Sequence, residues 1–74
     1  MATVRIVGWV EGLKKISLKD LIRAYTGLSL ADAKHRVDDV LSGCPVAFSF
    51  EDAKTAEAFR SAAEALGAEC ESDP

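Results

Sequence analysis

Alternating apolar and polar positions predict a strand near the start of the chain. Residues 3–10 repeat with period two, which places successive side chains on opposite faces. One face is expected to carry Val4, Ile6, Gly8 and Val10, and the other Thr3, Arg5, Val7 and Trp9. Both faces are rather apolar, so we expect this strand to lie in the middle of a sheet, with Gly8 marking a close approach by another group.

Apolar residues then recur at the i, i+3, i+4 and i+7 spacing of an amphipathic helix. The stripe of this first helix is formed by Leu18, Leu21, Ile22 and Tyr25. Ser17 and Asp20 have the spacing of a capping box, which predicts that the helix begins at Ser17. Ile16 is expected to pack on Leu21 as a hydrophobic staple. Gly27 supplies the left-handed residue that ends a helix.

Ser29 and Asp32 repeat the same start signal for a second helix. Its buried residues are expected to be Leu30, Ala33, Val37, Val40 and Leu41. Its exposed residues are expected to be Lys34, His35, Arg36, Asp38 and Asp39, and Gly43 ends it. Because only Leu28 separates Gly27 from Ser29, the two helices must turn sharply and form one rigid helical hairpin.

Shorter elements follow the break at Pro45. Residues 46–50 alternate briefly, as a short edge strand does. A third helix is expected to start within residues 49–52 and to end at Gly67. Its inward residues are Ala56, Phe59, Ala63 and Leu66, and its outward residues are Lys54, Glu57, Arg60 and Glu64.

A last short strand is expected at residues 68–71, with Ala68 and Cys70 on the core face, before a frayed tail at residues 72–74. The element order β-α-α-β-α-β predicts an α+β fold, a two-layer sandwich with helices on one face of a three-stranded antiparallel sheet. We expect the first strand to be central and antiparallel to both others. The 74 residues suffice for one domain, which we place at residues 1–71.

The two cysteines are expected to be free thiols. Cys44 and Cys70 would lie on strands separated by the central one, about 9 to 10 Å apart at about 4.8 Å per strand. A disulfide needs a Cα separation below about 7 Å. No export signal or long apolar run is visible in the sequence, so we expect a cytoplasmic protein that does not enter a membrane.

Charge is distributed unevenly along the chain. The whole sequence has nine Lys and Arg against twelve Asp and Glu, for a net charge of -3. Residues 14–36 hold only two acids, Asp20 and Asp32, against six basic residues: Lys14, Lys15, Lys19, Arg23, Lys34 and Arg36. The remainder keeps three basic residues and ten acids. A basic hairpin on an acidic domain favours an acidic partner.

One set of residues extends over the hairpin, the third helix and the start of the last strand: Lys15-Ile16, Arg23, Thr26-Gly27-Leu28, Leu30, Asp32-Ala33-Lys34, Val37, Ala56-Glu57-Ala58-Phe59 and Gly67-Ala68-Glu69. This set resembles the C-terminal domain of the ribosomal stalk protein of the large subunit. That family shares its fold with the ClpS protease adaptor. The resemblance implies the same element order as the one predicted above from the apolar pattern.

In the stalk family the helical hairpin recruits translational GTPase factors. The resemblance therefore implies a partner-binding surface at Lys15, Ile16, Arg23, Gly27 and Lys34. We add Lys19 to this surface, with Ile16 as its apolar anchor and the cations as its rim.

Two positions depart from the stalk pattern. Asp20 stands where the family usually has a basic residue, and Lys19 stands where it usually has an apolar one. The sequence also begins directly with the first strand of the domain, so we expect a standalone domain without the stalk protein's N-terminal dimerisation segment and hinge. These departures predict a changed choice of partner.

Other kinds of chemistry find little support in the sequence. His35 has no cysteine or carboxylate at ligand spacing, and neither Cys44 nor Cys70 belongs to a CxxC motif or pairs with a histidine, so we expect no metal, no cofactor and no enzymatic activity. The three phenylalanines follow the core pattern and no RNA-binding motif is present, which argues against nucleic acid as the main partner.

Val7 and Trp9 are the second candidate surface. If the opposite side of the first strand faces the helices, both side chains lie on the open face of the sheet, where Arg5 can pair with Glu69 or Glu71. An exposed indole beside a valine is a candidate self-association patch, so we expect a monomer or a weak homodimer.

The sequence thus predicts a non-enzymatic protein-interaction domain whose basic hairpin, residues 15–36, binds an acidic protein. A translation factor or a ribosome-associated protein is the partner that the resemblance favours. The alternative is a ribosome-associated or RNA-contacting accessory factor that uses the same cations on phosphates.

Overall fold

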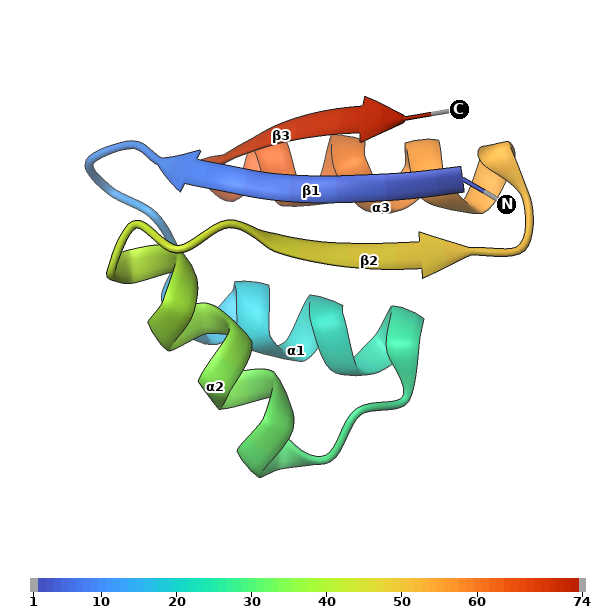
Figure 1. The fold of residues 1–74 in the computed structure, drawn as a ribbon. Helices are drawn as coiled ribbons and strands as arrows, with labels where there is room; N and C mark the ends of the chain where they lie inside the picture. The colour runs from blue at the N-terminus through green and yellow to red at the C-terminus, as the bar shows by residue number, and fades with distance from the viewer. Residues whose placement is uncertain (1, 74) are drawn as a thin grey trace.

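Three strands and three helices follow one another along the described residues in the predicted order. The computed structural model describes residues 2–73. Along the chain the elements are β1 (Ala2–Trp9), α1 (Lys15–Thr26), α2 (Leu30–Leu41), β2 (Val46–Phe50), α3 (Ala53–Ala65) and β3 (Ala68–Asp73) (Figure 1). The α+β class and the element order are confirmed.

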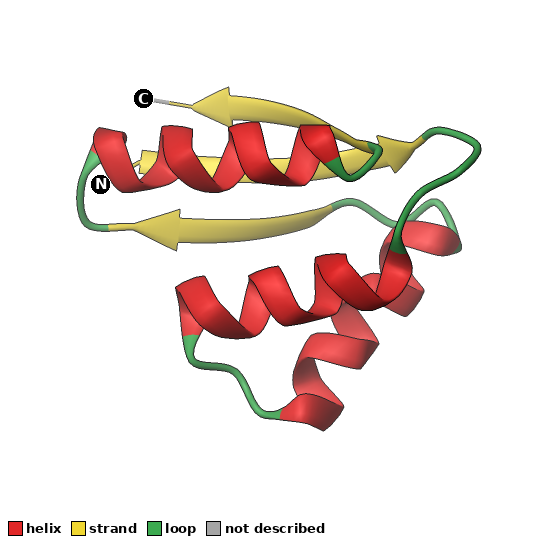
Figure 2. Cartoon of the chain, turned by 180° about the vertical axis from the view of Figure 1, so that it is seen from behind, coloured by secondary structure: helices red, strands yellow, loops and turns green. Residues whose placement is uncertain are grey.

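The sheet has the order β2-β1-β3, and β1 is antiparallel to both neighbours. The expected central position of the first strand is therefore confirmed. Along β2 buried and exposed residues alternate strictly, so one face of the sheet is covered and the other is open. Figure 2 shows α3 lying in front of β1 on the covered side. On the open face Arg5 forms an ion pair of 3.6 Å with Glu71.

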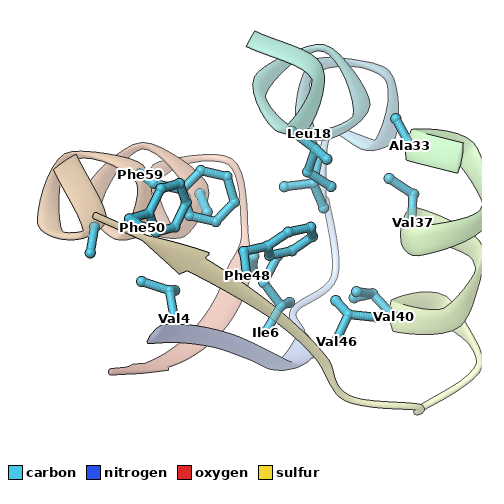
Figure 3. Close-up of a cluster of buried hydrophobic side chains, with 14 of the residues drawn as sticks. Val4, Ile6, Leu18, Ala33, Val37, Val40, Val46, Phe48, Phe50 and Phe59 are labelled. Atoms are coloured by element: carbon cyan, nitrogen blue, oxygen red, sulfur yellow. The ribbon is translucent and has the colours of Figure 1, made fainter. Parts of the chain in front are cut away.

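The core lies between the covered face of the sheet and all three helices (Figure 3). Phe59 of α3 is fully buried at its centre. Its ring centroid lies 5.4 Å from that of Phe48, 5.2 Å from that of Phe50 and 5.4 Å from that of Tyr25. Tyr25 was expected to be inward, but 37% of its surface is exposed, because it lies edge-on at the end of this aromatic cluster.

Two of the three helices begin with a side-chain cap, and both begin where the sequence placed their starts. Ser29 Oγ accepts a hydrogen bond of 3.2 Å from the backbone N–H of Asp32, which begins α2. Asp52 accepts one of 2.6 Å from the backbone N–H of Thr55, and the hydrogen bonds with Thr55 hold the pKa of Asp52 below its usual value. Both starts were readable because the cap bonds are local.

The predicted start of the first helix is wrong. The helix begins at Lys15 with Lys14 as its N-cap residue and no side-chain cap, so Ser17 lies within its first turn. Ile16 is exposed and does not form the expected staple with Leu21. The expected end is confirmed, because Gly27 adopts a left-handed φ of 72° and its N–H donates to the carbonyl of Arg23.

The last strand is longer than the sequence indicated. β3 continues to Asp73, where Thr3 pairs with Asp73 and Val4 with Ser72. The expected fraying at Ser72 and Asp73 is therefore wrong, because β1 offers a full strand for these residues to pair with. Pro74, the end of the expected tail, lies outside the described residues.

A register shift in β1 changes which residues share a face. Ile6 pairs with Cys70, whereas Gly8 pairs with Glu69 and Trp9 with Ala68, so Val7 is the extra residue of a β-bulge. A Cβ on Gly8 would lie 2.5 Å from Glu69 Oε1, which places the α-carbon of Gly8 against the open-face side chain of Glu69.

The expected grouping of the β1 side chains is therefore wrong beyond Ile6. Trp9 lies opposite Ala68, a buried core residue, and directly opposed residues share a face of a sheet. Trp9 thus belongs to the covered side at the end of the sheet and remains partly exposed there. Val10 follows the strand and is exposed instead of inward.

Both cysteines are free, as expected. Cys44 is exposed just before β2, and Cys70 is partly buried on β3, on the other side of the central strand. Burial, together with the nearby negative charge of Glu64, raises the pKa of the Cys70 thiol to about 11.

Candidate functional site

A groove runs between the start of α1 and one side of α2. It has a volume of about 420 Å³ and is open to solvent on one side. Eight residues line it: Lys15, Ile16 and Lys19 from α1, and Leu30, Lys34, Val37, Asp38 and Leu41 from α2. We refer to these eight residues as the hairpin groove.

Backbone hydrogen bonds from outside the hairpin fix the α1 wall of the groove. The N–H of Val10 donates to the carbonyl of Gly67 at 2.9 Å, and the N–H of Lys14 donates to the carbonyl of Leu66 at 3.0 Å. The loop after β1 is thereby tied to the turn between α3 and β3. This tertiary link sets the start of α1 at Lys15, so the lining residues Lys15 and Ile16 are presented by the rest of the fold.

The lining contains large apolar side chains that are open to solvent. Ile16 is 71% exposed and Leu30 is 52% exposed, while Val37 is buried beneath them. The prediction that Leu30 is inward is wrong. The apolar stripe of α2 is wider than its contact with the core, so Ala33, Val37 and Val40 meet the core and Leu30 lies to one side.

Three lysines surround this apolar surface. Lys15 and Lys19 extend from α1 and Lys34 from α2, against the one acidic lining residue, Asp38. The first turn of α1 contains no acid and begins beside Lys14, so the positive end of the helix dipole adds to the same field. The groove therefore presents a positive rim around an apolar floor.

Lys19 and Asp20 occupy different places despite being neighbours. The Lys19 side chain is only 25% exposed and lines the groove, whereas the Asp20 side chain is 65% exposed and does not. Their charged atoms, Lys19 Nζ and Asp20 Oδ1, lie 4.0 Å apart. This distance is at the limit of an ion pair, so Asp20 holds Lys19 only weakly.

Four of the six predicted partner-binding residues meet in the groove, namely Lys15, Ile16, Lys19 and Lys34. Arg23 is exposed further along α1, and Gly27 is the C-cap residue; neither lines the groove. The prediction missed Leu30, Val37, Asp38 and Leu41. Their spacing of seven, one and three residues places them on one side of a helix together with Lys34, and this periodicity was the available signal.

Val7 and Trp9 are both exposed, but the bulge separates them. Val7 lies at the bulge, and Trp9 lies opposite the core residue Ala68. They do not form the continuous open-face patch that the strand alternation predicted.

The remaining chemistry is simple. His35 is exposed on α2, and within residues 2–73 no three His, Cys, Asp or Glu side chains gather as a metal site would require. Over the same residues no helix has both the length and the apolar character needed to cross a bilayer.

Comparison with known proteins adds no relatives: no protein-family model matches the sequence, and no curated protein matches it either. The resemblance to the stalk domain therefore stays a prediction that depends on the residues named above.

Proposed function

We propose that the chain is a protein-interaction domain of the ribosomal stalk C-terminal type that binds an acidic protein partner through the hairpin groove. The observation that carries the proposal is the combination of exposed Ile16 and Leu30 with Lys15, Lys19 and Lys34 around them. Apolar anchors inside a charged rim are the usual composition of a protein-binding surface.

The resemblance supports this use of the hairpin and favours a translation factor or a ribosome-associated protein as the partner. Lys15, Ile16 and Lys34 match the stalk pattern and line the groove. Lys19, which departs from the stalk pattern, also lines the groove. This supports a partner that differs from those of the stalk family.

An RNA-contacting accessory factor is the second candidate, and the lysine rim is the observation that favours it. Lysines bind phosphates well, but an RNA surface also uses exposed aromatic rings for stacking. Phe48, Phe50 and Phe59 are buried here, and the partly exposed rings of Trp9 and Tyr25 do not line the groove. Contact with several phosphates would also make the affinity fall steeply between about 50 and 200 mM salt, which separates the two candidates.

Affinity capture from native lysate tests the proposal with three baits: the unaltered chain, an Ile16→Asp, Lys34→Glu variant, and Lys54→Glu. Lys54 is an exposed lysine of α3, outside the groove, so it is the matched charge reversal. The unaltered chain and Lys54→Glu should recover a common set of proteins. The Ile16→Asp, Lys34→Glu variant should lose this set. Recovery of the same proteins by all three baits would show that the groove is not the binding surface.

A further inference from the structure

Lys19 is the most covered of the three groove lysines, and its charge is only loosely held within the fold. Its side chain is three-quarters covered, and its Nζ lies 4.0 Å from the carboxylate of Asp20. We propose that the hairpin groove binds an amphipathic helix of the partner that carries carboxylates beside its apolar stripe, and that Lys19 is the residue that selects it. This inference depends on the proposed function, because it names the partner segment for the same site.

The shape of the lining fits a helix. On α2 the lining residues run from Leu30 to Leu41, which is three turns and about 16 Å at 1.5 Å per residue. Leu30, Val37 and Leu41 recur at helical spacing along this side. A partner helix laid against it can place its own i, i+3, i+4 and i+7 apolar residues on the same surface, which is a common mode of peptide recognition.

The charges fit a helix with acidic flanks. Lys15 and Lys19 stand on the α1 wall and Lys34 on the α2 wall, so cations border the apolar floor from both helices. A helix with glutamates on both sides of a leucine stripe can contact all three lysines. A basic or neutral flank would leave the lysines without partners as water is excluded.

Lys19 selects the partner helix by exchanging the carboxylate of Asp20 for a carboxylate of that helix. Its contact with Asp20 is long, and Asp20 is 65% exposed, so separating the two loses little. A glutamate on the bound helix would reach Lys19 in a groove from which the helix has displaced water, where the same charge pair is stronger. Glutamine at that position would leave the Lys19 charge partly desolvated and unpaired.

Two synthetic helical peptides with a fluorescent label test the selection. Both carry a leucine stripe over about 16 residues, or about 24 Å of helix. The first has glutamates along both flanks, and the second has glutamine at each of those positions. Binding is followed by fluorescence anisotropy for the unaltered chain, for Lys19→Met, and for Lys54→Met as the matched control on α3.

The unaltered chain and Lys54→Met should bind the glutamate peptide about tenfold more tightly than the glutamine peptide. Lys19→Met should reduce this preference to about threefold, since Lys15 and Lys34 remain, and should leave the affinity for the glutamine peptide within about twofold. Methionine keeps the length and helix preference of lysine, and circular dichroism verifies the fold of each variant. A full preference retained by Lys19→Met, or none in the unaltered chain, would overturn the inference.

Other occupants give different results. If a second copy of the chain fills the groove, sedimentation of the unaltered chain shows a dimer that Ile16→Asp abolishes, and the inference is wrong. It is also wrong if single-stranded RNA displaces the glutamate peptide. If neither peptide binds while lysate capture still depends on the groove, the helical segment is refuted and the proposed function stands. If capture also fails to depend on the groove, both are refuted.

Discussion

The hairpin and the α3–β3 side of the molecule are built from similar amphipathic patterns, yet they leave different surfaces. On α3 the large apolar residue, Phe59, is fully buried, and the outward positions carry charged, serine or alanine side chains. On the hairpin, Leu18 and Ile22 are buried in the same way, but Ile16 and Leu30 remain in solvent.

This difference separates stabilising residues from residues kept for binding. Burying a large aliphatic side chain contributes about 1.5–3 kcal/mol. Ile16 and Leu30 realise little of this in the free domain, so it remains available when a partner covers them.

Phe59→Ala should be the most damaging single change. It removes a fully buried ring that contacts Tyr25, Phe48 and Phe50, for an expected loss of about 3–5 kcal/mol in the free energy of unfolding. A domain of this size has only about 4–11 kcal/mol in total. Urea denaturation measures the change, and a loss below about 1 kcal/mol would contradict the position of Phe59 at the centre of the core.

Two isoleucines of α1 give a matched comparison. Ile22 is fully buried and Ile16 is 71% exposed, so the same substitution to alanine tests two environments on one helix. Ile22→Ala should cost about 2–5 kcal/mol, and Ile16→Ala should change stability by less than about 0.5 kcal/mol. Ile16→Ala should therefore fold normally but bind the partner weakly. Equal stability losses would remove the distinction between core and groove.

Much of the fold could be predicted because its signals are local. The alternation in β2, the cap bond of Ser29 and the left-handed Gly27 each depend on residues within a few positions of one another. The start of α1 could not be predicted, because it is set by hydrogen bonds from Val10 and Lys14 to a turn more than fifty residues later.

The candidate site was only partly predictable for the same reason. Lys15, Ile16, Lys19 and Lys34 were identified from charge and resemblance, and the structure brings them together. Leu30 was assigned to the core because its spacing fits the apolar stripe of α2, and only the packing angle of the two helices decides which edge of a stripe is left out. The bulge at Val7 likewise leaves no clear signal in the alternation.

The turn glycine of the hairpin and that of the α3–β3 side have different surroundings. Gly27 has a φ of 72° and open space where a Cβ would stand, whereas Gly67 has a φ of 106° and its added Cβ would lie 3.0 Å from the Cα of Leu13. Gly27→Ala should cost about 1 kcal/mol from backbone strain alone. Gly67→Ala should cost about 2–3 kcal/mol, because the backbone of Leu13 must also shift. Thermal denaturation distinguishes them, and an equal cost would contradict the close contact between this turn and the loop before α1.

Cys70 should make the stability of the domain depend on pH. Its pKa rises from 9.0 to about 11 on folding because of burial. As pH rises through this window the unfolded chain releases the proton first and binds fewer protons than the folded chain, so stability falls. Cys70→Ala should remove this part of the fall in stability, and Cys44→Ala should retain it. Urea titrations of both variants at pH 8.5 and at about pH 10.5 measure the fall in the free energy of unfolding between the two pH values. The same fall in both variants would contradict a buried Cys70 thiol.

Binding should take place in the hairpin groove while the core and the α3–β3 side remain unchanged. The most direct measurement is a two-dimensional NMR titration of the isotope-labelled chain with the glutamate peptide. The shifted backbone amides should cluster at the groove residues, above all Ile16, Lys19, Leu30 and Lys34, while those of α3 and β3 remain unshifted. Shifts centred on β3 or on the open face of the sheet would contradict it.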